Sequence, residues 1–258
     1  MKRFYLFMGA AGTILILFVA VPVIRMVFSA DPRLLAKTMT EAGVFSSIFL
    51  TLKCAFFATA GCALFGVPLA FLLARVDFYG KSIVSGIIDL PVMIPHTAAG
   101  IALLMVFGKK FFLGKAFADL GIRFVGTETG ISLAMAFVSL PFLVNSAKDG
   151  FSAVNPRLER VAETLGASPL RTFFTISLPL AFRPILSGVI MMWARGISEF
   201  GAVIILAYHP MTAPVLVWER FTSFGLAYAL PVAVLLILIC LVIFSLLRFI
   251  GRPPREDV

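Results

Sequence analysis

The sequence predicts an all-α integral membrane protein, with about six transmembrane helices in a single domain over residues 1–258. Hydrophobic residues make up 60% of the chain and charged residues only 14%, whereas ordinary soluble domains have roughly 45–50% and 25%. A soluble fold of this length has too little interior to cover so many apolar side chains. In addition, the apolar residues lie in runs long enough to cross a bilayer, which indicates a membrane protein.

Six stretches qualify as spans, because a helix needs about 20 apolar residues to cross a bilayer core about 30 Å thick. Five of them contain no Asp, Glu, Lys or Arg: residues 4–24, 54–74, 90–108, 129–147 and 221–247. The sixth, residues 184–206, contains Arg195 and Glu199. The first stretch follows Met1-Lys2-Arg3, as in a signal peptide. However, it is too long and lacks a small-residue cleavage site, so we expect an uncleaved span.

The net charge of +9 is typical of nucleic-acid-binding proteins as well as of membrane proteins. Here most basic residues lie singly between apolar runs, so we interpret the charge as a topology signal and expect no nucleic-acid partner. With a cytoplasmic N-terminus, more Lys and Arg residues lie inside than outside, Arg248, Arg252 and Arg255 among them. We therefore expect a multi-pass cell-membrane protein with both termini cytoplasmic. The basic outer segment 109–123 is the exception, and its apolar spacing predicts a short surface helix.

The chain lacks the residue patterns of an enzyme. Cys54, Cys62 and Cys240 all lie in apolar runs, and their odd number and spacing match neither a disulfide framework nor a metal site. The sequence contains no G-x-x-x-x-G-K-[ST], H-E-x-x-H or G-x-S-x-G motif. We therefore expect no catalytic residue, no bound metal and no bound cofactor in this chain.

The longest predicted cytoplasmic connection, residues 148–183, has strong helix signals. Asn155-Pro156 is an N-cap followed by proline at the first helical position, and Gly166 is placed to end the helix. Ser168-Pro169 repeats the start signal, and Pro179 is expected to disturb the second helix, which leads into the membrane. One face of the first helix is apolar, with Leu158, Val161, Ala162 and Leu165. From the residues alone, this face could be buried against lipid headgroups, against the same chain or against a partner protein.

The same loop carries a family resemblance. The run Glu159-Arg-Val-Ala-Glu-Thr-Leu-Gly166, then nine residues and Ile176-Ser-Leu178-Pro179, resembles the EAA loop of ATP-binding-cassette (ABC) importer permeases. Val161-Ala162 stand where that family often has Ala-Ala, and valine keeps the face apolar. The resemblance implies a type I importer fold in which this loop is a coupling helix that inserts into a separate ATPase subunit. The residues assigned to it are Arg157, Glu159, Arg160, Ala162, Glu163, Thr164, Leu165, Gly166, Ala167 and Ser168.

Two further segments resemble the permeases of molybdate and tungstate importers, and more distantly those of sulfate importers. The first begins at Asp89-Leu-Pro-Val-Met-Ile-Pro-His and ends at Gly100. The second begins at Trp193 and includes Ser198-Glu-Phe-Gly-Ala202 and, further on, Glu219-Arg-Phe-Thr-Ser-Phe-Gly225. The implied cargo is therefore an oxyanion, tungstate or molybdate, with sulfate as the alternative.

The resemblance also implies partners. A second copy of the permease and two ATP-binding subunits, which use ATP and Mg²⁺, are expected in the same complex. An extracytoplasmic oxyanion-binding protein is expected to deliver the cargo, and the lipid bilayer surrounds the whole.

Candidate residues for the translocation path or gate lie in the predicted spans 90–108 and 184–206. They are Pro91, Pro95, His96, Thr97, Arg195, Ser198, Glu199 and Phe200. The two prolines break the helical hydrogen-bond ladder of the third span. Charges inside a span cost about 2.5–3.5 kcal/mol each on insertion scales, and Arg195 and Glu199 are spaced to pair on one helix face. A structural salt bridge and a path-lining role both fit this pair.

A stand-alone secondary transporter is the remaining alternative. Such transporters typically carry intramembrane carboxylates for ion coupling, or inverted repeats. The predicted spans hold one interior carboxylate, Glu199, with Asp89 near a span edge, and no repeat is evident. This pattern favours the ABC permease.

Overall fold

The computed structural model describes residues 2–250, with side chains described up to Leu246, and within that part every regular element is helical. This confirms the predicted all-α class. The predicted cytoplasmic tail with Arg252 and Arg255 lies outside the described residues, as does the side chain of Arg248. In chain order the elements are α1 (Lys2–Ser29), α2 (Pro32–Thr40), α3 (Ala42–Arg75), α4 (Lys81–Met93), α5 (His96–Phe107), α6 (Phe112–Asp119), α7 (Glu128–Ala153), α8 (Pro156–Thr164), α9 (Pro169–Thr172), the π-helix η1 (Phe173–Ser177), α10 (Leu178–Ile197), α11 (Gly201–Leu206), α12 (Ala213–Phe224) and α13 (Leu226–Ile250).

Five helical stretches among the described residues are long and apolar enough to cross a membrane: α1, α3, α7, the continuous run from α9 to α10, and α13. A sixth span arises if the bent pair of α4 and α5 is counted as one. The predicted number of about six spans is therefore confirmed. The predicted helix at residues 109–123 is also found, as the shorter α6.

The break predicted within the span at residues 90–108 is confirmed, and it divides the span into two helices. Helix α4 ends at Met93, α5 begins at His96, and the two are bent by 115°. The cause is Pro95, since a residue that precedes proline is held in extended backbone, here Ile94 at φ −83° and ψ 146°. Pro91 is tolerated one turn earlier, inside α4.

The span predicted at residues 184–206 is also misplaced. The helix starts earlier, at Pro169, and stops at Ile197. After a break at residues 198–200 the short α11 begins, so Glu199 is not helical. The last span begins at Leu226 instead of Phe221, because Gly225 adopts φ +84° between α12 and α13.

Helix α3 is longer than its charge-free stretch, because it includes Lys53. The Lys53 Nζ lies 2.6 Å from Glu128 Oε2 at the start of α7. Pairing offsets part of the cost of a charge inside a long apolar helix, so this span extends beyond its charge-free run.

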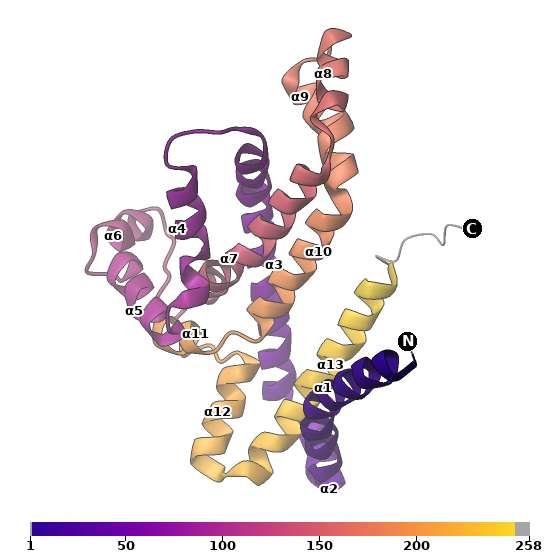
Figure 1. Ribbon diagram of the computed structural model, residues 1–258. Coiled ribbons are helices and arrows are strands. Elements are labelled where there is room, and N and C mark those ends of the chain that lie inside the picture. The colour runs from indigo at the N-terminus through magenta and orange to yellow at the C-terminus, as the bar shows by residue number, and fades with distance from the viewer. Residues whose placement is uncertain (1, 251–258) are drawn as a thin grey trace.

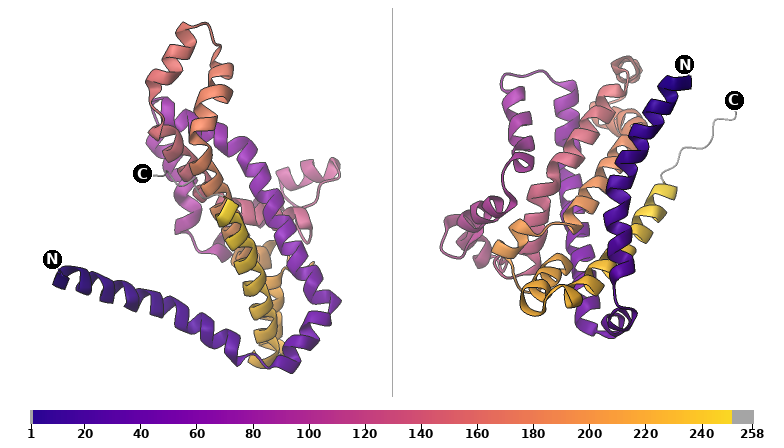
Figure 2. Two further views of the ribbon diagram at one scale, coloured as in Figure 1. Left: turned by 90° about the vertical axis from the view of Figure 1, so that its right-hand side faces the viewer. Right: turned by 60° about the horizontal axis from the view of Figure 1, so that its bottom comes forward.

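The core of the molecule is formed by α3, α7 and α10, which lie side by side (Figure 1). Their fully buried side chains include Ala55, Met135, Leu143 and Met192. Helix α10 approaches α7 so closely that a Cβ on Gly188 would lie 2.8 Å from the Cβ of Ser146. By contrast, α1 has no buried residue and extends away from the body of the molecule (Figure 2).

The two ends of the bundle differ. Helices α8 and α9 occupy one end, whereas α2 lies at the other with α12 near it, and the start of α1 and the end of α13 point toward the α8 side (Figure 1). The predicted loop 148–183 is shorter than expected, because α7 runs on to Ala153 and α10 starts at Leu178.

The helix signals in this loop are confirmed. The Asn155 side chain accepts a hydrogen bond from the backbone N–H of Arg157 (3.0 Å), and Ser168 accepts one from Arg171 (3.3 Å). Gly166 adopts φ +88°, the left-handed conformation that ends α8.

The expected disturbance at Pro179 is found as the π-helix η1, and the helix continues through it into α10. Proline lacks an N–H and leaves one carbonyl without its helical partner. The wider π-turn, in which the N–H of Leu178 bonds to the carbonyl of Phe173, absorbs that defect.

Candidate functional site

The apolar face of α8 is open to the surroundings. Leu158 is 48% exposed, Val161 57% and Leu165 84%, although all three are large apolar residues. The helix carries no buried residue at all. Exposed apolar side chains gathered on one helix face mark a surface that is covered by another molecule or by lipid.

Most polar residues assigned to this segment are exposed as well. Arg157, Arg160, Glu163, Thr164, Gly166 and Ser168 are all exposed, and Ala162 and Ala167 are partly buried. Charged groups therefore surround the apolar face of α8. A mixed surface of this kind suits a specific protein interface, with an apolar centre and a polar rim.

Glu159 differs from the other charged residues of α8, because it turns inward. Its Oε1 and Oε2 accept hydrogen bonds from the Nε of Arg75 at 3.0 and 2.9 Å, and Oε1 also accepts one from the Nη2 of Arg75 at 2.8 Å. The Ser177 hydroxyl donates to the same Oε1 (2.8 Å), and Arg75 Nη2 donates to the carbonyl of Val154 (3.0 Å). We call these four residues the α8 anchor.

The α8 anchor joins four segments at one point. Arg75 ends α3, Val154 follows α7, Glu159 belongs to α8 and Ser177 directly precedes α10. The Arg75 and Glu159 side chains are only 12% and 13% exposed. A largely buried, two-pronged arginine–carboxylate pair is a strong and geometrically specific contact. The short helix α8 is therefore fixed to all three core helices.

The second candidate site lies where the two broken spans meet. The Glu199 Oε2 lies 3.0 Å from Arg195 Nη2 and 3.1 Å from His96 Nδ1. Arg195 Nη2 also lies 2.9 and 3.0 Å from the two ring nitrogens of His96, and Arg195 Nη1 donates to the Ser198 hydroxyl at 3.3 Å. We call these four residues the break cluster. The predicted pairing of Arg195 with Glu199 is confirmed, and His96 joins it.

Three elements position the break cluster. His96 is the first residue of α5, Arg195 lies in the last turn of α10, and Glu199 sits in the break before α11. The Glu199 Oε1 accepts a hydrogen bond from the backbone N–H of Ala202 (2.9 Å), at the start of α11. A Cβ on Gly201 would lie 2.8 Å from the Cβ of His96, so α11 packs directly on the histidine.

The remaining path candidates lie around the same break, with one exception. Pro95 caps α5, and Thr97 follows His96 and is exposed. Phe200 precedes α11 and packs on Trp218, with ring centroids 5.6 Å apart. Pro91 instead is buried within α4. Residues from two predicted spans are thus brought together, but they do not form one continuous lining.

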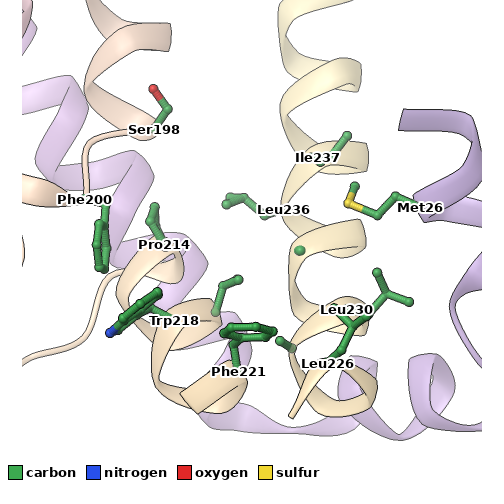
Figure 3. Close-up of a pocket in the computed structure, with 13 residues that line it drawn as sticks. Met26, Ser198, Phe200, Pro214, Trp218, Phe221, Leu226, Leu230, Leu236 and Ile237 are labelled. Atoms are coloured by element: carbon green, nitrogen blue, oxygen red, sulfur yellow. The ribbon is translucent and has the colours of Figure 1, made fainter. Parts of the chain in front are cut away.

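Two cavities bear on the candidate path, and Ser198 and Phe200 line the first of them. An apolar cavity of about 440 Å³ lies beside α12 and α13 (Figure 3), and Ser198 is the one hydroxyl among the residues that line it. A groove of about 570 Å³ between α4 and α7 is more polar, with Asp89, Asn145, Ser146 and Asp149 in its wall. There the Asn145 Nδ2 donates to Asp89 Oδ1 (2.6 Å). The second cavity therefore offers more polar groups to a hydrated ion than the first.

Several structurally important residues are not among the sequence candidates. Arg75 and Ser177 of the α8 anchor are missing, and so is Asn145 of the groove. Arg75 directly follows the predicted span 54–74, where a basic residue indicates only topology, and its partner Glu159 lies 84 positions away. Ser177 lies inside the I-x-L-P motif, at the variable position.

Within residues 2–250, no group of three or more His, Cys, Asp or Glu side chains is arranged to hold a metal ion.

Comparisons with known proteins give this chain a family and several named relatives. Residues 66–255 match the family model of the "binding-protein-dependent transport system inner membrane component". The chain is 47% identical over 249 residues to the molybdate/tungstate transport system permease protein WtpB of Pyrococcus abyssi, covering 95% of this chain and 94% of that protein. It is 33% identical over 236 residues to the probable sulfate transport system permease protein cysT of Chlorokybus atmophyticus, covering 89% and 82%.

Solved structures with the same fold include a bacterial ABC transporter involved in the import of the acidic polysaccharide alginate. The TM-score to that chain is 0.75, over 100% of this chain and 97% of the other, at 15% identity. At this identity the match is evidence of the fold alone.

Proposed function

Because the chain belongs to the family of binding-protein-dependent transport system inner membrane components, we propose that it is the membrane permease of an ATP-driven importer for molybdate or tungstate. The resemblance of residues 89–100 and 193–225 to oxyanion permeases supports this cargo. Relatives named for molybdate and tungstate transport share 42–47% of their residues with this chain, more than the sulfate permeases do. Sulfate is therefore the second candidate cargo.

The observation that carries the proposal is the form of α8. This helix is capped at its start, exposes an apolar face, and is fixed to the core helices by the α8 anchor. In our proposal its exposed face docks on a cytoplasmic ATP-binding subunit. Arg157, Arg160 and Glu163 form rim pairs that set the register of that interface. ATP and Mg²⁺ act on the partner subunit, and this chain carries out no chemical reaction.

We further propose that two copies of the chain form the path, with an extracytoplasmic binding protein that delivers the ion. The ion passes the break cluster and then the polar groove that Asp89 and Asn145 line. The N- and C-termini are cytoplasmic in this arrangement, on the same side as α8. Carboxylates in the groove repel an anion, so the path does not retain its cargo.

Uptake by the reconstituted complex tests the proposal. The chain is co-expressed with an ABC ATP-binding subunit and an oxyanion-binding protein from the same organism, and the purified complex is placed in proteoliposomes. We expect uptake of radiolabelled tungstate that requires ATP. Molybdate should inhibit this uptake, whereas sulfate at the same concentration should not. Uptake that persists with an ATPase-inactive partner, or that follows sulfate instead, would refute the proposal.

A further inference from the structure

The charges of the break cluster are not equally accessible. Glu199 is only 1% exposed, whereas the Arg195 and His96 side chains are 22% and 37% exposed. The carboxylate is therefore sealed behind the two nitrogen-bearing side chains. An ion that approaches the cluster meets the guanidinium and the imidazole first, and the carboxylate lies behind them.

The buried carboxylate has a contact at each of its oxygens, although only Oε1 accepts a hydrogen bond among the described residues. Oε1 accepts the backbone N–H of Ala202, and Oε2 lies at ion-pair distance from both Arg195 and His96. Glu199 thereby fixes its two neighbours relative to the start of α11. Its charge also balances that of Arg195, which makes a buried guanidinium tolerable in a membrane protein.

Donor capacity remains on the exposed side. A guanidinium has five N–H donors, and the contacts of Arg195 among the described side chains involve Nη1 and Nη2 only. The Ser198 hydroxyl lies beside it, on an exposed residue, where it accepts from Arg195 Nη1 and donates to the backbone carbonyl of Arg195 at 3.0 Å. Arg195 and His96 present N–H groups, and rotation of the Ser198 hydroxyl away from that carbonyl adds an O–H donor. Such donors match the oxygens of a tetrahedral oxyanion.

We propose that Arg195, His96 and Ser198 form a transient contact site for a tetrahedral dianion, and that Glu199 is the positioning residue that holds this site in place. The inference rests on the proposed function and names the point where the cargo touches the permease. Because the Arg195 and Glu199 charges cancel, the site attracts a dianion at short range through the nearer cation but does not bind it tightly. Weak contact is what a path requires, since the ion must leave again.

A neutral double variant separates this role from a structural one. Arg195→Met with Glu199→Gln removes both charges and leaves no unpaired buried ion, so a pair that serves only packing is replaceable in this way. In proteoliposomes that contain the whole complex, we expect at least a tenfold lower tungstate uptake rate, with assembly and melting temperature unchanged. Arg195→Lys, which keeps a cation, should retain more uptake than the double variant.

The electrostatic character of the site is measured independently by labelling. Ser198→Cys is made in a variant of the complex whose permease has Cys54, Cys62 and Cys240 replaced by Ala. We expect an anionic methanethiosulfonate reagent to react several-fold faster than a cationic one, and inorganic tungstate to slow the labelling. Tyr79→Cys, in an exposed turn remote from the break, serves as the control and should show no protection by tungstate.

The outcomes distinguish the two proposals. If the wild-type complex transports tungstate and the double variant does so equally well, the contact site is refuted while the proposed function stands. Equal labelling by both reagents, without protection by tungstate, refutes the contact site whatever the transport result. If the wild-type complex shows no ATP-dependent uptake but tungstate slows the labelling of the Ser198→Cys variant, the proposed function fails and the contact site stands.

Discussion

Removal of Arg75 should uncouple ATP hydrolysis from transport. In the Arg75→Ala variant, Glu159 would keep only the Ser177 hydroxyl as a partner, at a carboxylate that is 13% exposed. Removing one partner of a buried ion pair costs about 3–5 kcal/mol. Part of this cost is local, because it opposes the docking of α8 on the ends of α3, α7 and α10. At 1.36 kcal/mol per factor of ten, even 3 kcal/mol shifts that docking equilibrium by about 100-fold.

The assay is the ratio of tungstate taken up to ATP hydrolysed in proteoliposomes that contain the complete complex. We expect Arg75→Ala to lower this ratio at least tenfold, with ATP hydrolysis retained, because the exposed face of α8 can still dock on its partner. The double exchange of Arg75→Glu with Glu159→Arg should recover part of the coupling. Recovery stays incomplete, since the carbonyl of Val154 loses its donor.

A nearby exposed pair provides the control. Lys81 Nζ lies 2.7 Å from Asp77 Oδ1 at the same end of the molecule, but the Asp77 side chain is 97% exposed. An ion pair this exposed contributes little to stability, so Asp77→Asn should leave the coupling of ATP hydrolysis to transport unchanged. If Arg75→Ala transports as many ions per ATP as the wild type, the α8 anchor does not transmit force and the reasoning fails.

Three further predictions concern packing and docking. Gly166→Ala places a side chain at φ +88°, which costs about 1–2 kcal/mol, and should weaken co-purification of the ATP-binding subunit; equal recovery would contradict the role of the turn. Val161→Ser removes an exposed apolar side chain of α8 and should reduce that co-purification without lowering the melting temperature of the isolated permease, whereas a lower melting temperature would indicate that Val161 packs within the chain. Gly188→Leu puts a Cβ 2.8 Å from that of Ser146 and should lower stability by about 1–3 kcal/mol, measured by thermal melting. The control is Gly12→Leu on the uncovered α1, where no atom lies within 4 Å of the new Cβ. This control should leave stability unchanged.

The sequence predicts most of the architecture because hydropathy reports directly on the bilayer. The number of spans, the caps of α8 and the left-handed Gly166 all follow from local rules, since each depends on residues a few positions apart. The breaks are harder, because a run such as residues 90–108 is apolar throughout whether it is straight or bent by 115°. Pro91 and Pro95 predict a break in the hydrogen-bond ladder of the span. They do not predict whether the helix is kinked or divided in two, because both forms have the same composition.

The candidate sites were less predictable the farther apart their residues lie along the chain. Arg195 and Glu199 lie four residues apart, and their contact is a property of local spacing. His96 joins them from 99 positions away, and Arg75 reaches Glu159 over 84. Such pairs depend on how α3, α7 and α10 pack, and a single sequence contains no direct signal for that.

The close contact between α5 and α11 restricts how the chain can vary. A Cβ on Gly100 would lie 2.9 Å from the carbonyl oxygen of Ala202 and from the Cβ of Ile205, and one on Gly201 would meet His96. Enlargement of one partner is therefore tolerated only if the other becomes smaller or the backbones separate. Among descendants of this sequence, positions 100, 202 and 205 should change size together, and insertions within 94–100 should occur only with matching changes in 198–206. Residues 94–100 and 198–206, about a hundred positions apart in the sequence, should therefore evolve together.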